Sequence, residues 1–300
     1  MSSNPFRSGF VAIIGLPNVG KSTLMNQLVG SKVAIATPKP QTTRFNLRGI
    51  LTGPNYQIVF VDTPGIHEAR DLFNRLMVEQ ALRALEEVDG VVWVVDASDR
   101  RPQAEEKILE IIKRAGKPTI LVLNKIDLIK KGELLPMMDY FSRAYPFRAI
   151  VPVSALERDG LEELVQEIVA MLPEGPAYYP PEMVTDQPER VLAAEIIREK
   201  LFMLTRQEIP YSTAVVVEEF REDPEKNLLI IQATIYVEKD SQKGIVIGKG
   251  GQMLKKIGTL AREELEFIFG KRVYLDLWVK VLRGWRKEER LLRRLEFPYF

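Results

Sequence analysis

The residues whose types and spacing point most clearly to chemistry lie between Gly15 and Ser22, which read G-L-P-N-V-G-K-S. They match the phosphate-binding loop pattern G-x-x-x-x-G-K-[ST], placed between an apolar run and a helical segment. Glycines at both ends would let the backbone approach a polyphosphate with its N–H groups pointing inward, beside the positive end of a helix. Lys21 could then reach the β- and γ-phosphates, and the Ser22 hydroxyl could bind Mg²⁺.

A second motif, D-T-P-G, follows the apolar run 56–61 and contains Asp62 and Gly65. A carboxylate at the end of a strand beside a phosphate loop is where a direct or water-mediated Mg²⁺ contact is needed. The Gly65 backbone N–H could meet the γ-phosphate. By itself the motif is equally compatible with an ordinary turn.

A third motif, N-K-I-D, follows the apolar run 119–123. The Asp127 carboxylate could accept hydrogen bonds from N1–H and the 2-amino group of guanine, which adenine lacks, and such a polar pair can discriminate by about 10⁴–10⁵. The Lys125 stem could lie along the base, and Asn124 could brace the loop. Further on, S-A-L at Ser154, Ala155 and Leu156 could offer backbone N–H groups to the guanine O6.

The elements around these motifs predict one α/β domain. Continuous apolar strands are expected at 10–14, 90–95, 119–123 and 149–153, with a hairpin formed by 45–51 and 56–61. Helices are expected at 21–29, 72–88, 104–115 and 161–172. This alternation predicts a mostly parallel sheet with helices on both faces, whose ligands lie at the carboxyl ends of the strands. Most of the motifs begin at such ends, so we expect a single nucleotide site.

The four motifs, in this order, resemble the guanine-nucleotide-binding domain of the translation-factor-related GTPases, a P-loop fold. The resemblance covers residues 10–172 and implies that GTP or GDP is bound with Mg²⁺. It makes 31–43 the first switch, with Thr43 as its Mg²⁺ ligand, although the adjacent Thr42 is an alternative, and it makes the region around Gly65 the second. The implied nucleotide-binding residues are Gly15, Pro17, Asn18, Val19, Gly20, Lys21, Ser22, Thr23, Asp62, Gly65, Asn124, Lys125, Asp127, Ser154, Ala155 and Leu156, with Ser22, Thr43 and Asp62 on the metal.

One departure from the family pattern concerns hydrolysis. Ras-like proteins carry a glutamine after D-x-x-G that orients the attacking water, and Ile66 stands there in this chain. We therefore expect slow intrinsic hydrolysis, with Asn18, Lys21, Thr43 and Gly65 as the catalytic residues. In the subfamily that shares Asn18, this asparagine can act with a bound K⁺. The neighbouring His67 is a weaker candidate for a general base.

The second half of the chain predicts a separate domain. A proline-rich stretch, 173–188, marks the boundary, so we expect domains at 1–175 and 189–300 with a semi-rigid linker at 176–188. A helix is expected at 189–204, strands at 214–217 and 228–237 around an acidic turn, helices at 241–247 and 252–269, and a strand at 272–282. This order, with G-K-G-G between two helices, resembles the type II (bacterial) KH module, an α+β RNA-binding fold.

The G-x-x-G segment has the chemistry for binding a nucleic-acid backbone. Glycines let a sugar-phosphate chain pass close, helix N–H groups can bind phosphate, and an apolar groove can hold about four bases. Residues 239–256 carry five lysines and one acid, although the net charge of the chain is only +1. The candidate RNA-binding residues are Gly248, Lys249, Gly250, Gly251, Lys243 and Lys255. The alternative is a glycine-rich helix break with solvated lysines.

Composition narrows the remaining possibilities. The chain has 300 residues, one histidine and no cysteine, which excludes disulfides, thiol nucleophiles and multi-histidine metal sites. No membrane-spanning stretch or signal peptide is evident, so we expect a cytoplasmic protein. A basic amphipathic helix is expected at 284–295. Packing is its first interpretation, followed by an auxiliary RNA contact and by peripheral attachment to the inner face of the cell membrane.

A GTP site joined by a short stiff linker to a G-x-x-G module resembles the Era family of bacterial GTPases. Further shared stretches are P-Q-T-T-R at 40–44 and A-E-I-I-R-E-K at 194–200. The resemblance implies a monomeric factor that binds the 3′ end of small-subunit ribosomal RNA, and the small ribosomal subunit itself, under the control of GTP. Two other classes stay open: an ATP-dependent enzyme acting on RNA, and a non-catalytic GTP-gated scaffold or membrane-associated signalling GTPase.

Overall fold

The computed structural model describes residues 5–66 and 71–295 of the chain. The chain divides into two compact units, Met1–Ala69 with Leu76–Asp186, and Arg70–Arg75 with Gln187–Phe300. The first unit therefore extends beyond residue 175, where we expected the first domain to end.

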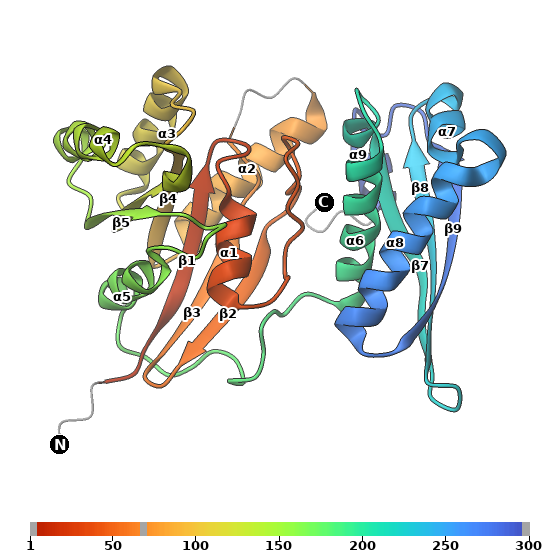
Figure 1. Cartoon of the computed structure of the whole chain (residues 1–300), viewed down its shortest axis with the longest axis horizontal. Helices are drawn as coiled ribbons and strands as arrows, with labels where there is room; N and C mark the ends of the chain where they lie inside the picture. Colours follow the sequence, from red (N-terminus) through yellow and green to blue (C-terminus); the bar gives the residue numbers. More distant parts are fainter. Residues whose placement is uncertain (1–4, 67–70, 296–300) are drawn as a thin grey trace. The chain divides into compact units, whose positions relative to one another are not determined.

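The described part of the first unit forms one six-stranded sheet (Figure 1). Its strands lie in the spatial order β2-β3-β1-β4-β5-β6, with β2 antiparallel to β3 and all other neighbours parallel. The strands are β1 (Arg7–Gly15), β2 (Leu47–Gly53), β3 (Tyr56–Asp62), β4 (Gly90–Asp96), β5 (Thr119–Asn124) and β6 (Ala149–Val153). Every residue of β4 and β5 is buried, as expected for central strands covered on both faces.

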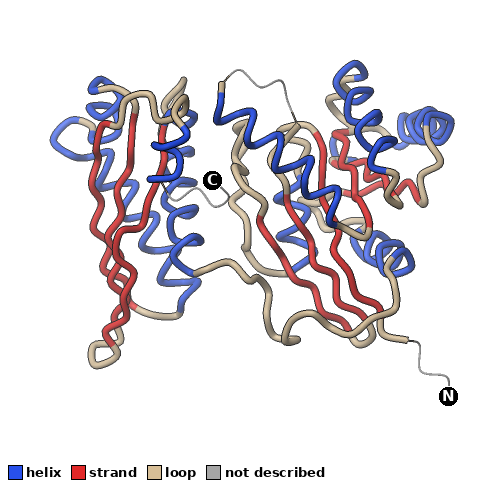
Figure 2. Tube along the Cα trace, turned by 180° about the vertical axis from the view of Figure 1, so that it is seen from behind, coloured by secondary structure: helices blue, strands red, loops and turns tan. Residues whose placement is uncertain are grey.

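Helices cover both faces of this sheet, as predicted. They are α1 (Lys21–Val29), α2 (Leu72–Glu87), α3 (Pro102–Ala115), α4 (Lys131–Ala144) and α5 (Leu161–Met171). Apolar side chains of α2, α3 and α4 form one buried cluster with alternate residues of β1, β4 and β5. Helices α1 and α5 lie on the opposite face (Figures 1 and 2). All parallel strands therefore end at the same edge, which is where the motifs lie.

Helix α4 has no counterpart among the predicted elements. Pro136 lies inside it and removes one backbone donor, which hides the helix from a search for uninterrupted helical sequence. The apolar residues Leu134, Met137, Met138 and Phe141 nevertheless recur at helical spacing and pack against the main cluster. Phe141 is completely buried and contacts Trp93 edge to face, with ring centroids 5.5 Å apart.

The proline-rich segment is bound along the first unit instead of standing free. The buried Gln57 side chain accepts hydrogen bonds from the N–H groups of Tyr178 and Tyr179 at 2.7 and 2.9 Å, and donates to the Tyr179 carbonyl. On the outer edge of β2, the Ile50 N–H donates to the Val184 carbonyl at 2.9 Å. Arg48 pairs with Asp186 at 2.8 Å. The segment thus covers the edge of the sheet.

The second unit is a three-stranded sheet with helices on one face. Its elements are α6 (Glu189–Leu204), β7 (Thr213–Asp223), β8 (Leu228–Val237), α7 (Asp240–Ile247), α8 (Gln252–Phe269), β9 (Arg272–Val281) and α9 (Glu289–Arg294). Strand β8 lies between β7, which is antiparallel to it, and β9, which is parallel. Helices α6, α7 and α8 share one buried cluster with the sheet. The predicted order of helices and strands is confirmed.

Two predicted elements of this unit were wrong in extent. Strand β7 continues to Asp223 through residues that we expected to form an acidic turn, because they pair with β8 beyond a bulge between Val217 and Glu219. The terminal helix is only α9, because the chain turns at 283–287 to bury Trp285, whose Nε1 donates to the Ser212 carbonyl. Within the described ranges, no helix combines the length and apolar character that a membrane crossing requires.

Candidate nucleotide site and nucleic-acid groove

The phosphate loop has two positions that only glycine can occupy. Gly15 has φ +154°, and a Cβ there would lie 2.4 Å from the Val94 carbonyl oxygen. Gly20 has φ +97°, and a Cβ there would lie 2.3 Å from Nδ2 of Asn124. Both distances are far below van der Waals contact, so the loop can pass β4 and Asn124 only because these side chains are absent.

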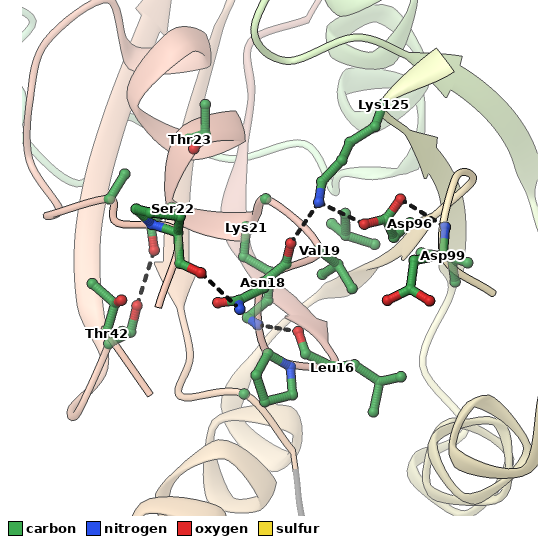
Figure 3. A pocket seen from close by; sticks show the side chains of 18 of the residues that line it. Leu16, Asn18, Val19, Lys21, Ser22, Thr23, Thr42, Asp96, Asp99 and Lys125 are labelled. Atoms are coloured by element: carbon green, nitrogen blue, oxygen red, sulfur yellow. Dashed lines mark hydrogen bonds and ion pairs between the residues drawn. The ribbon is translucent and has the colours of Figure 1, made fainter. Parts of the chain in front are cut away.

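Lys21 is folded back against its own loop (Figure 3). Its Nζ donates to the carbonyl oxygens of Leu16 at 2.9 Å and Gly15 at 3.3 Å. Burial lowers the pKa of Lys21 to about 8, and the nearby Asp62 carboxylate opposes the shift. A phosphate would replace the two carbonyl contacts with a stronger, charge-assisted one.

Two hydroxyls and one carboxylate meet at the end of β3. Ser22 Oγ and Thr43 Oγ1 both donate to Asp62 Oδ2, at 2.6 and 3.2 Å. The other oxygen, Asp62 Oδ1, is fully buried and has no hydrogen-bond partner within the described residues. Burial raises the pKa of Asp62, and Lys21 and the two hydroxyls oppose the shift. This all-oxygen set with an unsatisfied carboxylate fits Mg²⁺, which keeps few protein ligands beside phosphate.

The two candidate threonines of the first switch have different surroundings. Thr43 Oγ1 lies 2.9 Å from Ser22 Oγ and is buried beside Asp62. Thr42 Oγ1 instead bonds Thr37 Oγ1 and the Lys39 carbonyl within its own loop, both at 2.7 Å. The geometry of the loop therefore favours Thr43 as the residue next to the candidate metal site.

Asn124 joins three loops at the edge of the sheet. Its Nδ2 donates to the Val19 carbonyl at 2.8 Å, and its Oδ1 accepts from the Ala155 N–H at 3.0 Å. Nearby, Ser154 Oγ donates to Asp127 Oδ1 at 2.5 Å, which leaves the second carboxylate oxygen for a base. Leu156 is largely exposed. Hydrogen bonds thus connect the N-K-I-D segment to both the S-A-L segment and the phosphate loop.

A pocket of about 520 Å³ lies over the phosphate loop. The loop from Leu16 to Thr23, residues of the first switch, Gly65 and Lys125 line it, whereas Asp127 and the S-A-L residues lie outside its lining. Several further lining residues were not predicted, among them the charged residues Asp96, Asp99, Arg101 and Glu105. Asp96 could have been noticed as a carboxylate at the end of a buried strand, and the other three gave no signal.

The described residues of the second switch, Gly65 and Ile66, carry no side chain that could act as a general base. Gly65 packs against Pro17, where a Cβ would lie 2.9 Å from the proline nitrogen. The Ile66 side chain is buried in the apolar cluster of the sheet and its N–H donates to the Gly15 carbonyl at 3.2 Å. His67 lies outside the described residues, as does the rest of this switch up to residue 70.

The G-K-G-G segment of the second unit has the backbone expected of a close-approach loop. Gly248, Gly250 and Gly251 all have left-handed φ angles, between +60° and +79°. A Cβ at Gly248 would lie 2.9 Å from the Met253 nitrogen, whereas nothing lies within 4 Å of one at Gly250 or Gly251. Two of the three glycines thus leave open space directly before the N-terminus of α8.

A shallow groove of about 420 Å³ adjoins this segment. Lys255, a predicted RNA-binding residue, lines it, while Lys243 lies on α7 outside it. Sequence analysis missed most of the other lining residues, which are Leu254, Gly258, Thr259, Arg262, Leu275 and Leu277. Its two walls are α8 and β9, so the groove offers apolar side chains with basic residues beside them, a combination suited to unstacked bases.

Family models match both halves of the chain. Residues 10–125 match the model described as 50S ribosome-binding GTPase, and residues 208–286 match the KH domain. The matched ranges cover the phosphate loop, Asn124 and Lys125 in the first unit, and the G-K-G-G segment in the second.

Curated relatives match over the whole length. GTPase Era of Geobacter metallireducens is 52% identical over 99% of this chain and 100% of its own. The chain belongs to the Era family of GTPases. GTPase Era of Syntrophus aciditrophicus is also 52% identical, over 98% of this chain and 95% of its own.

Solved Era structures show the same fold in complexes. A crystal structure of a point variant of Aquifex aeolicus Era bound to GDP·AlF₄⁻ matches with a TM-score of 0.92 at 46% identity, over 96% of this chain and 98% of that one. Era in complex with MgGDPNP and nucleotides 1506–1542 of 16S ribosomal RNA matches with the same score at 47% identity and the same coverage. The predicted fold classes, a P-loop GTPase domain followed by a KH domain, are confirmed, and the chain is a GTPase.

The low pKa of Lys21 predicts that nucleotide binding depends on pH when it is measured without Mg²⁺, starting from the empty protein. Above pH 8 the free lysine loses its proton, whereas phosphate binding requires the charged form, so binding must take up a proton. We expect GDP affinity to fall about tenfold between pH 7 and pH 9. Calorimetry in buffers of different ionisation enthalpy would detect the proton uptake. K21R, which stays charged, should lose the dependence, and equal affinity at both pH values would contradict the assignment.

The assignment of Asp127 leads to a prediction about which base the nucleotide site selects. D127N removes the charged acceptor for the guanine N1–H and 2-amino groups, so GTP affinity should fall at least about 100-fold, while the weak affinity for ATP stays unchanged. Fluorescence competition against a labelled GDP would measure both. D139N is a matched control, because Asp139 is an exposed carboxylate on α4 that pairs with Arg143. Unchanged GTP affinity in D127N would remove Asp127 from the site.

Proposed function

We propose that this protein is a GTP-dependent switch that binds the 3′ end of small-subunit ribosomal RNA and acts in assembly of the small ribosomal subunit. The observation that carries the proposal is the presence in one chain of a guanine-selective phosphate site and a G-x-x-G loop beside an apolar groove. The Era relative bound to MgGDPNP and a 16S ribosomal RNA fragment supports both ligands.

The residues of the first unit have separate tasks in this proposal. Backbone N–H groups of the phosphate loop and Lys21 hold the β- and γ-phosphates, and Asp127 and the S-A-L backbone select guanine. Ser22 and Thr43 would hold Mg²⁺, with Asp62 close to it, and Mg²⁺ would neutralise charge on the phosphates when bound. Gly65 presents its N–H toward the γ-phosphate. Hydrolysis is slow because Ile66 cannot orient water.

In this proposal, the two switch segments transmit the nucleotide state to the RNA-binding unit. Contacts with the γ-phosphate and Mg²⁺ would hold residues 31–43 and Gly65 in place, and hydrolysis would release them. Thr43 lies four residues before β2, whose outer edge binds the proline-rich segment through Ile50 and Arg48. The segment that leads into the KH unit is therefore attached to the strand that follows the first switch.

Asn18 is our candidate for K⁺-dependent catalysis. It has a left-handed φ of 67°, and its Nδ2 donates to the Pro38 carbonyl of the first switch at 3.0 Å. This contact joins the phosphate loop to the first switch through the amide nitrogen of Asn18, and the amide oxygen, Oδ1, is the atom that would bind a monovalent cation. A K⁺ there would stabilise charge that develops on the transferring phosphoryl group.

A GTPase assay that replaces KCl with NaCl tests this role. We expect hydrolysis at least about tenfold faster in K⁺, because one well-placed charge contributes that much to many transition states. N18A should show the same low rate in both salts. Equal rates for the unsubstituted protein in K⁺ and Na⁺ would refute K⁺ activation.

On the RNA side, the loop at Gly248, Lys249, Gly250 and Gly251 would clamp the sugar-phosphate backbone. Phosphate oxygens would accept from the N–H groups at the start of α8, and Lys255 would neutralise charge along the groove. Lys243 on α7 would add to the positive field at longer range.

Gly250→Asp tests the loop directly. Gly250 has φ +60°, which strains any L side chain, but a Cβ there meets nothing within 4 Å, so aspartate causes no clash and places a carboxylate where phosphate would pass. We expect RNA affinity to fall at least about 30-fold in a filter-binding assay with a 3′-terminal small-subunit RNA oligonucleotide. Gly270→Asp is the matched control: Gly270 has φ +63° and equally open space, at the far end of α8. Equal affinity for both variants would remove the KH loop from the proposal.

For the terminal residues, packing is the interpretation that we retain. Trp285, Leu292 and Leu295 are all buried, so the apolar face expected for α9 is used within the second unit. This favours packing over membrane attachment and leaves the basic residues of α9 for an auxiliary RNA contact. We propose a monomer that acts in the cytoplasm, where its ribosomal RNA partner is found.

A further inference from the structure

A carboxylate outside the recognised motifs contacts the lysine of N-K-I-D. Asp96 ends β4 directly beside Asn124 of β5, and its Oδ2 lies 2.5 Å from Nζ of Lys125 (Figure 3). The Asp96 side chain is 9% exposed and that of Lys125 is 31% exposed, so this ion pair is partly shielded from water. A shielded, charge-assisted contact is stronger and more directional than a surface pair.

The Asp96 carboxylate is itself fixed by its loop. Its Oδ1 accepts hydrogen bonds from the Ser98 N–H at 2.9 Å, from Ser98 Oγ at 2.7 Å and from the Asp99 N–H at 3.2 Å. Burial opposes ionisation, but the contacts from Lys125 and Ser98 outweigh it and hold the pKa of Asp96 below its usual range. The carboxylate is therefore charged and has one orientation.

Lys125 uses the same ammonium group to hold the phosphate loop. Its Nζ donates to the Asn18 carbonyl at 2.8 Å, and Asn18 is one of the left-handed residues of that loop. Lys125 is itself left-handed, with φ 66°, so its backbone aims the side chain across the loop at an energetic cost. Without a second partner, the long side chain would be free to leave this position.

We propose that Asp96 is a positioning residue for guanine-nucleotide binding, which holds the Lys125 ammonium between the two loops so that its stem lies under the base. Asp96 does not contact the nucleotide in this role. It acts by fixing Lys125, and through Lys125 the Asn18 carbonyl. Loss of Asp96 therefore weakens retention of the nucleotide without changing which base is chosen, because Asp127 stays in place.

The test measures the rate at which fluorescent GDP dissociates from the full-length protein. D96N should raise this rate about tenfold, as expected when one partner of a shielded charge pair is lost. In a K125M background, D96N should add less than about twofold, because the residue through which Asp96 acts is gone. E195Q is the matched control, since it breaks another buried carboxylate pair, with Arg198, in the second unit and outside the lining of the nucleotide pocket, and it should change the rate less than about twofold.

Three outcomes would overturn the proposal: an unchanged rate in D96N, an equal effect of D96N in the K125M background, or an equal effect of E195Q. The first excludes a role for Asp96, the second an action through Lys125, and the third a specific effect. If D96N does not fold, S98A replaces it, because it removes only one donor to the carboxylate. S98A should raise the rate about two- to threefold, and a rate equal to that of the unsubstituted protein would overturn the proposal.

Discussion

The nucleotide site depends on one buried carboxamide. Asn124 binds the Val19 carbonyl of the phosphate loop with its nitrogen and the Ala155 N–H of the S-A-L loop with its oxygen. The contact requires glycine at position 20, since any Cβ there would overlap Asn124 Nδ2. It also requires that β1, β5 and β6 end at one edge, which the parallel sheet provides. Three loops from distant parts of the sequence thereby become one rigid surface, and each residue that touches nucleotide has a fixed position relative to the others.

The second unit also depends on glycines in a loop, but for a different kind of contact. Its loop must let a phosphate chain pass close to the backbone, so it uses glycines at left-handed φ angles directly before a helix N-terminus. The groove beside it lies between α8 and β9, whose apolar residues also contribute to the buried cluster of the unit. The first site is a pocket lined by charged and hydrogen-bonding residues, whereas the second is a shallow groove suited to bases already unstacked. A switch needs both properties, tight retention of nucleotide and reversible contact with RNA.

Much of the fold and of the candidate nucleotide site was predictable from the sequence, for physical reasons. Helices such as α1, α6 and α8 have glycine, proline or polar boundaries, and their predicted limits agree with the structure. The phosphate loop was evident because its chemistry is local. Helix α4 was missed because Pro136 obscures it, and β7 was cut short because its acidic residues are supported only by pairing with β8. Asp96 and the course of the proline-rich segment depend on contacts across the sheet, with Lys125 and Gln57, and local sequence carries little trace of such contacts.

In our proposal, the nucleotide bound by the first unit controls the affinity of the second unit for RNA. The most direct measurement is the equilibrium affinity of the full-length protein for a labelled oligonucleotide from the 3′ end of small-subunit ribosomal RNA, with Mg²⁺ and either GDPNP or GDP. The account predicts binding at least about fivefold tighter with GDPNP, the lower end of ordinary coupling between sites. Equal affinity in the two nucleotide states would contradict it, even if both ligands bind tightly.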